Sequence, residues 1–167
     1  MTASYQVPSD TFDISKVRDV RRRHSQILTA WAVVWMVVGV VIWSGQNNDP
    51  QTRFFVAVGT QFVIWGAIDL IFGLIGLQQA RTVDAIPVKS NQATGEIADA
   101  KKLAKTLIFS MKLNWIWLVI GLALIVWGVS SNMNSSLLGN GVGVLVQGLF
   151  LFVFDKHFYA KLVKAMG

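Results

Sequence analysis

The sequence contains no cysteine, and only 14% of its 167 residues are charged. The absence of cysteine excludes disulfide bonds, iron–sulfur clusters and thiolate chemistry. The low charge argues against an ordinary soluble domain, in which about a quarter of the residues are charged. The chain also lacks a P-loop, a GxGxxG motif, a nucleophile–base set and a nucleic-acid motif. We therefore expect a protein that is not an enzyme and has no nucleic-acid partner.

In place of charge, the chain has four long apolar runs, at residues 27–44, 54–77, 107–129 and 137–154. At about 1.5 Å per helical residue, each can cross a hydrocarbon core of about 30 Å. Such continuous runs exclude a β-barrel, whose strands alternate. The predicted fold is an all-α membrane protein, in which residues 1–167 form one membrane domain with a bundle of four transmembrane helices.

Positive charge is concentrated before the first run, between the second and third runs, and after the fourth run. The other two connections together carry only Arg53. This pattern follows the positive-inside rule, which places both termini and the middle connection in the cytoplasm. We expect a multi-pass protein of the bacterial cytoplasmic membrane, in contact with its lipids. The positive residues include Lys16, Arg18, Arg21, Arg22, Arg23, Arg81, Lys89, Lys101, Lys102, Lys105, Lys156, Lys161 and Lys164.

Local signals predict where the helices begin and end. Asp13 or Ser15 can cap the first helix. A turn at Asp49–Pro50 makes the first two runs a hairpin, and a short polar turn at 131–136 does the same for the last two. We expect a cytoplasmic connection over 82–105, with a loop at Pro87 and the third helix starting to form near Thr94.

The chain also contains an internal repeat. A shift of 82 residues lays the first hairpin, about 24–81, on the second, about 106–163, without a gap. We expect a duplication whose halves are related by a two-fold axis near the membrane normal. The matched residues are Trp35 with Trp117, Val37 with Val119, Gly39 with Gly121, Gly59 with Gly141, Gly66 with Gly148 and Phe72 with Phe154.

Glycines recur seven residues apart on every run except the first, which has one. Residues at this spacing lie on nearly one side of a helix, where a small residue lets another backbone approach closely. We predict helix packing through Gly39, Gly59, Gly66, Gly73, Gly121, Gly128, Gly141 and Gly148. The glycine-rich stretch 139–143 resembles a phosphate loop, but it lacks the lysine, and we interpret it as a flexible helix start.

Asp69 and Asn114 are the candidate polar pair inside the bundle. Both lie roughly 20 to 25 Å from the outer ends of their helices, on the sides that carry small residues. We predict that they meet directly or through a water. The pair could be a structural hydrogen bond that fixes register, or a proton or cation site. Gln147 is predicted to make another interhelical hydrogen bond.

His24 and His157 are the only histidines, and neither has a spacing typical of a metal site. We expect no metal and no required cofactor, although one histidine could be an axial ligand to a haem or chlorin. Trp35, Trp65 and Trp117 are too deep for an interfacial belt. They could pack the bundle or line a site for a lipid or a chlorin or carotenoid pigment. Asp155, Lys156 and His157 are expected to form an interfacial charge cluster.

Three segments carry a family resemblance: WAVVW in the first run, QFVIWGAIDL in the second and GNGVGVLVQGLFLFVFDKH in the fourth. They resemble a family of small bacterial four-span membrane proteins that is classified only as a domain of unknown function. The resemblance covers residues from about 24 to 158. It implies the four-helix fold and supplies no mechanism or catalytic residue.

Three functions are consistent with these features. The first is a non-catalytic accessory or scaffold subunit of a larger membrane complex, photosynthetic or respiratory, that packs against other membrane subunits through glycine and aromatic helix faces. The second is a small dimeric proton-coupled transporter that uses Asp69. The third is a membrane enzyme acting on lipids, for which Asp155 and His157 are the only polar pair.

Overall fold

The structure is a computed structural model that describes residues 12–45, 50–85 and 93–167. Within these ranges the chain forms four helices, α1 (Ile14–Ser44), α2 (Pro50–Asp84), α3 (Ala93–Ser130) and α4 (Ser135–Met166). All four are long and apolar enough to cross a membrane by length and composition. The prediction of an all-α fold with four helices is therefore confirmed for the described residues.

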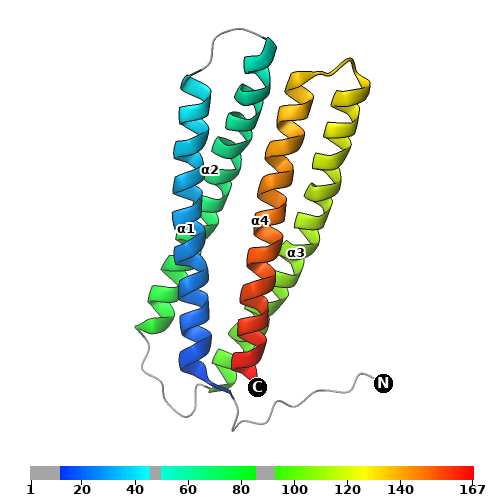
Figure 1. The fold of residues 1–167 in the computed structure, drawn as a ribbon. Coiled ribbons are helices and arrows are strands. Elements are labelled where there is room, and N and C mark those ends of the chain that lie inside the picture. The colour runs from blue at the N-terminus through cyan, green and yellow to red at the C-terminus, as the bar shows by residue number, and fades with distance from the viewer. Residues whose placement is uncertain (1–11, 46–49, 86–92) are drawn as a thin grey trace, which may run out of the picture.

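The helices form two neighbouring antiparallel pairs (Figure 1). α1 packs along α2, α3 packs along α4, and the two pairs meet mainly through α2 and α4. A smaller contact joins α1 to α4. The start of α1 and the end of α4 lie at one end of the bundle, together with the end of α2 and the start of α3. We call this the basal end, and we call the opposite end the distal end.

Asp13 fixes the start of α1. Its side chain accepts a hydrogen bond from the Lys16 backbone N–H at 3.1 Å, and its own N–H donates to the Ala165 carbonyl at 3.1 Å. The Ser15 hydroxyl donates to the same carboxylate at 2.7 Å. Hydrogen bonds from Ser15 and Lys16 hold the pKa of Asp13 below its usual range. Of the two predicted caps, Asp13 is the one that the structure shows. Its bond to Ala165 also joins the start of α1 to the end of α4.

The turn between α3 and α4 uses left-handed backbone. Asn132 and Met133 have φ angles of 54° and 59°, a conformation that is uncommon for residues other than glycine. The Asn134 N–H donates to the Gly128 carbonyl at 2.8 Å, and the Asn134 side chain accepts a backbone N–H of α4 at 3.1 Å. These bonds satisfy groups that the two helix ends would otherwise leave unpaired. The predicted short polar turn is confirmed.

The predicted connection over 82–105 includes the start of the third helix, as expected. α2 continues to Asp84 and α3 begins at Ala93, close to the predicted start, because the residues on both sides of the connection are good helix formers. Pro50 stands at the first position of α2, where a proline fits because it has no N–H to leave unpaired. Residues 46–49 and 86–92, which include the predicted turn and loop positions Asp49 and Pro87, lie outside the described residues.

Each helical pair is closed by two glycines whose backbones touch. A Cβ atom added to Gly39 would lie 2.7 Å from the Gly59 carbonyl oxygen, and one added to Gly121 would lie 3.0 Å from the Gly141 carbonyl oxygen. Any side chain at these positions would push the two helices apart. Glycine is therefore needed at both contacts for its small size.

The glycine contacts recur in the same register in both pairs. Gly66 of α2 lies against the Ala32 backbone of α1, and Gly148 of α4 lies against the Asn114 backbone of α3. Each of these residues has its counterpart 82 positions later in the sequence. The eight glycines predicted to pack helices are all buried. Those of α2 face α1, and those of α3 and α4 face each other, so these glycines build the two pairs and not the contact between them.

The two pairs differ at the basal end. There the main apolar cluster joins α1, α3 and α4, and no residue of α2 belongs to it. An ion pair between Arg18 of α1 and Glu96 of α3, at 2.5 Å, reinforces this side of the bundle. The buried members of the cluster are Val17, Val20, Leu28, Ala100, Leu107, Phe154, Phe158, Leu162 and Ala165.

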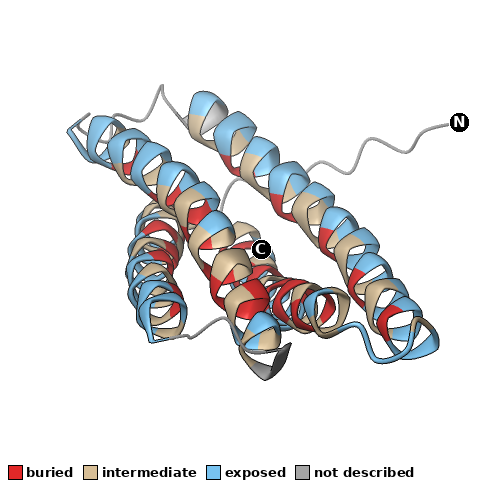
Figure 2. Cartoon of the chain, turned by 90° about the horizontal axis from the view of Figure 1, so that it is seen from above, coloured by how far each residue is buried: buried red, intermediate tan, exposed pale blue. Residues whose placement is uncertain are grey.

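Large apolar side chains are unusually abundant on the surface of the bundle. Large apolar side chains are exposed along the outer faces of all four helices, and the buried faces turn toward one another (Figure 2). Five polar residues are buried inside: Ser25, Asp69, Asn114, Gln147 and Asp155.

The glycine contacts can be tested in both pairs at once. Gly39→Val and Gly121→Val should each destabilise the fold by about 1–3 kcal/mol, because the added side chain meets the paired glycine backbone. Ala123→Val, at an exposed position of α3, is the control and should change stability by less than about 0.5 kcal/mol. The measurement is unfolding by denaturing detergent, followed by circular dichroism. Glycine variants as stable as the control would contradict the close backbone contact.

Candidate functional site

The contact between the two helical pairs is polar along much of its length. We call it the α2–α4 seam. On α4, Gly139 and Gly143 are four residues apart and both are buried against α2, where a Cβ on Gly143 would lie 2.6 Å from the Gln61 Cβ. Residues at this spacing share a helix face, and Gln147 follows at the same interval. The stretch 139–143 lies in the second and third turns of α4, near the predicted helix start, and its glycines also let the two pairs approach each other.

Asp69 and Gln147 form the buried centre of the seam. They are only 4% and 2% exposed, and the Gln147 Nε2 donates a hydrogen bond to the Asp69 Oδ2. A carboxyl group away from water is costly unless it is hydrogen-bonded. The amide of α4 therefore stabilises the acid of α2, and the interhelical hydrogen bond predicted for Gln147 is confirmed.

Toward the distal end, three more side chains form an oriented chain of hydrogen bonds. The Trp65 Nε1 donates to the Gln61 Oε1 at 3.1 Å, and the Gln61 Nε2 donates to the Asn140 Oδ1 at 2.7 Å. The Asn140 Nδ2 donates in turn to the Ser136 carbonyl at 2.8 Å. Both ends of the Gln61 amide are used, so its orientation is fixed by its partners.

A second buried carboxyl, Asp155 of α4, connects three helices. Ser110 and Asn114 of α3 donate to its Oδ2 at 2.5 and 3.2 Å, and the His24 Nε2 of α1 lies 3.2 Å from its Oδ1. The side chains of Asp155 and His24 are 5% and 17% exposed. With three donors on one acid, both carboxylate oxygens are satisfied by protein.

The structure shows no direct hydrogen bond between Asp69 and Asn114, which were predicted to meet directly or through a water. Both residues are buried, but Asp69 binds Gln147 and Asn114 binds Asp155, so each is hydrogen-bonded to a residue of α4. The reason is the order of the helices, since α4 packs against both α2 and α3. Counting turns from the helix ends gave the two residues a similar depth, but it did not identify which helix lies opposite each side chain.

The predicted cluster of Asp155, Lys156 and His157 is also wrong. Asp155 is buried, whereas Lys156 and His157 are exposed. Consecutive residues of a helix point in directions about 100° apart, so three neighbours do not share a face. The imidazole beside Asp155 belongs to His24, and His157 instead meets the Phe158 ring edge-on at 5.5 Å. The polar pair expected for a lipid-acting enzyme is therefore not formed.

The deep tryptophans pack against other aromatic rings. Trp65 of α2 and Trp117 of α3 meet edge-on, with ring centroids 4.9 Å apart. Trp35 lies 4.0 Å from the Phe62 ring, and its buried indole N–H has no hydrogen-bond partner among the described residues. These contacts use ring surface that a pigment or lipid would otherwise cover.

The ring of His24 is likewise held by protein. It lies 4.8 Å from the Phe154 ring, and its Nε2 is directed at Asp155. Axial ligation of a haem or chlorin through this nitrogen would require the hydrogen bond to break. Among the described residues, no three His, Asp or Glu side chains come together as a metal site would need.

The arrangement is that of an all-α protein with membrane-length helices and two buried acids satisfied through one central helix. Residues 27–156 match the family of unknown function DUF6992, and the chain belongs to this family. The match includes Asp69, Asn114, Gln147 and Asp155, and it lies just after His24. The family resemblance of the sequence is thus confirmed. No curated protein and no solved structure matches the chain.

A double-mutant cycle can test the seam. Gln147→Leu should destabilise the fold by about 1–3 kcal/mol, because the buried Asp69 loses its donor. Combined with Asp69→Leu, it should show a coupling energy of about 0.6–2 kcal/mol. The matched control is the cycle of Asp69→Leu with Asn114→Leu, which should be additive within about 0.5 kcal/mol. Detergent unfolding gives both values, and the opposite ranking of the two cycles would contradict the assignment of partners.

Proposed function

We propose that the chain is a non-catalytic integral membrane protein that crosses the membrane four times and serves as an accessory or scaffold subunit of a larger membrane complex. The larger complex would be a photosynthetic or a respiratory assembly. The single observation that carries the proposal is the apolar outer surface, because large apolar side chains are exposed along all four helices. Such a surface is stable next to lipid or other apolar helices.

The charge distribution supports an orientation with both ends in the cytoplasm. Lys16 to Arg23, Arg81, Lys101 to Lys105 and Lys156 to Lys164 lie toward the basal end, where α1 and α3 begin and α2 and α4 end. Arg53 is the positive residue of the described distal end. An excess of lysine and arginine at one end favours the cytoplasmic side, which is that of the inner membrane in a bacterium.

The outer face of α3 is the best candidate for contact with another subunit. Because the predicted glycine faces are used within the helical pairs, they are not available to a partner. α3 packs extensively only on α4, which leaves an exposed stripe of large apolar side chains at helical spacing. The stripe consists of Trp115, Val119, Leu122 and Val126. A neighbouring transmembrane helix of another subunit would fit this face through van der Waals packing.

We also propose that the two helical pairs arose by duplication. The glycine contacts support this origin, because Gly39 with Gly59 and Gly121 with Gly141 occupy matching positions and make matching backbone contacts. An axis near the membrane normal would relate the two pairs. The basal apolar cluster, which omits α2, would be a later departure from that symmetry.

Purification from native membranes tests the subunit proposal. In mild detergent the protein should elute with at least one other membrane protein. Val119→Ala/Val126→Ala should reduce the amount of that partner several-fold without changing the unfolding midpoint, because both side chains are exposed. Val34→Ala/Val41→Ala, on exposed positions of α1, is the matched control and should retain it. A protein that elutes alone as a monomer would count against the proposal.

A small proton-coupled transporter, working as a dimer, is the second candidate. One observation favours it: two carboxyl groups, Asp69 and Asp155, are buried between the helices, and the His24 Nε2 lies 3.2 Å from the Asp155 Oδ1. Carboxyl groups and histidines inside a membrane are the usual elements of proton relays.

Flux measurements separate the two candidates. If the second is right, Asp69→Asn should abolish proton-driven transport in proteoliposomes, since an amide cannot release a proton. The Asn side chain can still bind Gln147, so the unfolding midpoint should change little. A protein without proton-driven flux, or an unchanged flux in Asp69→Asn, would remove the transporter and leave a structural role for the acid.

A further inference from the structure

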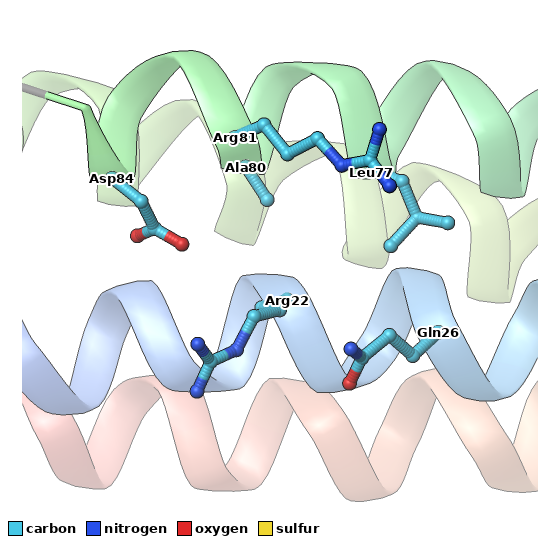
Figure 3. A pocket seen from close by; sticks show the side chains of 6 residues that line it. All are labelled: Arg22, Gln26, Leu77, Ala80, Arg81 and Asp84. Carbon is cyan, nitrogen blue, oxygen red and sulfur yellow. The ribbon is translucent and has the colours of Figure 1, made fainter.

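α1 and α2 border a small cavity near the basal end, with a volume of about 160 Å³ (Figure 3). Residues from both helices line it: Arg22, Gln26, Leu77, Ala80, Arg81 and Asp84. The side chains of the polar seam lie elsewhere, so the cavity is separate from the site described above.

Local sequence explains why the cavity forms here. Closer to the middle of the helices, Gly73 and Gly76 of α2 press against Thr29 and Ser25 of α1, which brings the two backbones together. One turn beyond Gly76, Ala80 is buried, and its small side chain leaves space between the two helices. The long side chains at the rim are then those of Arg22 and Arg81, whose like charges repel each other.

The polar groups around the cavity are poorly satisfied by protein. Three side chains have no hydrogen-bond or ion-pair partner among the described residues: those of Arg81, Gln26 and Asp84. The Arg22 side chain binds only Asp19, on its own helix, at 3.1 Å. Figure 3 shows Arg81 extending along the cavity toward Gln26 and Leu77, with Asp84 toward the other end near Arg22. The two cations stand on opposite walls, with the Gln26 amide on the side toward which Arg81 extends (Figure 3), and guanidinium and amide N–H groups are suitable donors to an oxyanion.

We propose that this cavity binds the phosphodiester group of a membrane phospholipid. The proposal rests on the membrane location argued above. Among the lining residues, Arg22 and Arg81 contribute two positive charges and Asp84 one negative charge, a net charge of +1. Beside Arg22, Asp19 and its second partner Arg23 add one charge of each sign and leave this net charge unchanged. This matches the single negative charge of a phosphodiester better than the nearly two charges of a phosphomonoester. Basic cavities between transmembrane helices on the cytoplasmic side are typical headgroup sites.

The position of the cavity along the helices fits a lipid and not only a free phosphate. Leu77 is the last residue of the second apolar run, and Arg81 follows one turn later, so the cavity lies where a bilayer changes from acyl chains to headgroups. On its apolar side, Ile27 of α1 and Leu74 of α2 are exposed. Acyl chains attached to a bound phosphate would run along these side chains.

Native mass spectrometry of the purified full chain tests the site. Phosphatidylglycerol added to delipidated protein should bind, and Arg22→Gln/Arg81→Gln should weaken this binding at least ten-fold. Lys101→Gln/Lys102→Gln removes the same charge from exposed positions of α3 and should bind like the native protein. Diacylglycerol, which lacks the phosphate, should not compete. Equal losses in both double variants, or full competition by diacylglycerol, would overturn the proposal.

Two further measurements distinguish a lipid phosphate from free phosphate and provide a variant that keeps both arginines. Millimolar inorganic phosphate should leave phosphatidylglycerol bound, and displacement would assign the cavity to a free anion instead of a lipid. Asp84→Asn, which retains both arginines, should tighten phosphatidylglycerol several-fold and admit phosphatidic acid, while unchanged binding of both lipids would contradict the charge argument. These readouts are independent of partner co-purification, so the lipid site and the subunit role can fail separately.

Discussion

Direct backbone contact between paired glycines is the constraint on which the rest of the structure depends. Helices surrounded by lipid gain little from burying apolar surface, so their association relies on close packing and on interhelical hydrogen bonds. Gly39 with Gly59, and Gly121 with Gly141, provide the close packing inside each pair. Because the glycines are used there, contact between the pairs depends on a different set of residues, namely Gly139, Gly143 and polar side chains.

α4 is the helix through which this second set acts. One face places Gly141 and Gly148 against α3, and another places Gly143 and Gln147 against α2. Asp155, near its basal end, is bound by side chains of α1 and α3. Both buried acids are therefore satisfied by contacts that involve α4. These contacts fix the register of all four helices. They also bury two carboxyl groups beside α4, which is the feature on which the transporter hypothesis depends.

Much of the fold could be predicted from sequence because periodicity and charge are local signals. The four helices, the cap at Asp13 and the burial of Asp69 and Asn114 follow from residues close to one another in the chain. The partners of the two polar residues could not be predicted, because they depend on which helices are neighbours. His24 and Asp155, for example, are 131 positions apart. Gly139, Gly143 and Gln147 are four residues apart, and this spacing was a signal for the seam. The interpretation of 139–143 as a helix start did not use it.

The omission of α2 from the basal apolar cluster has a mechanical consequence. From Gly76 onward, α2 contributes no residue to the buried apolar core that α1, α3 and α4 share, and Ala80 is buried beside α1. With so few buried apolar contacts, the last two turns of α2 are expected to open locally before the other three helices separate. A lipid bound between Arg22 and Arg81 would connect this end of α2 to α1, so the lipids around the protein would influence how firmly the second helix is held.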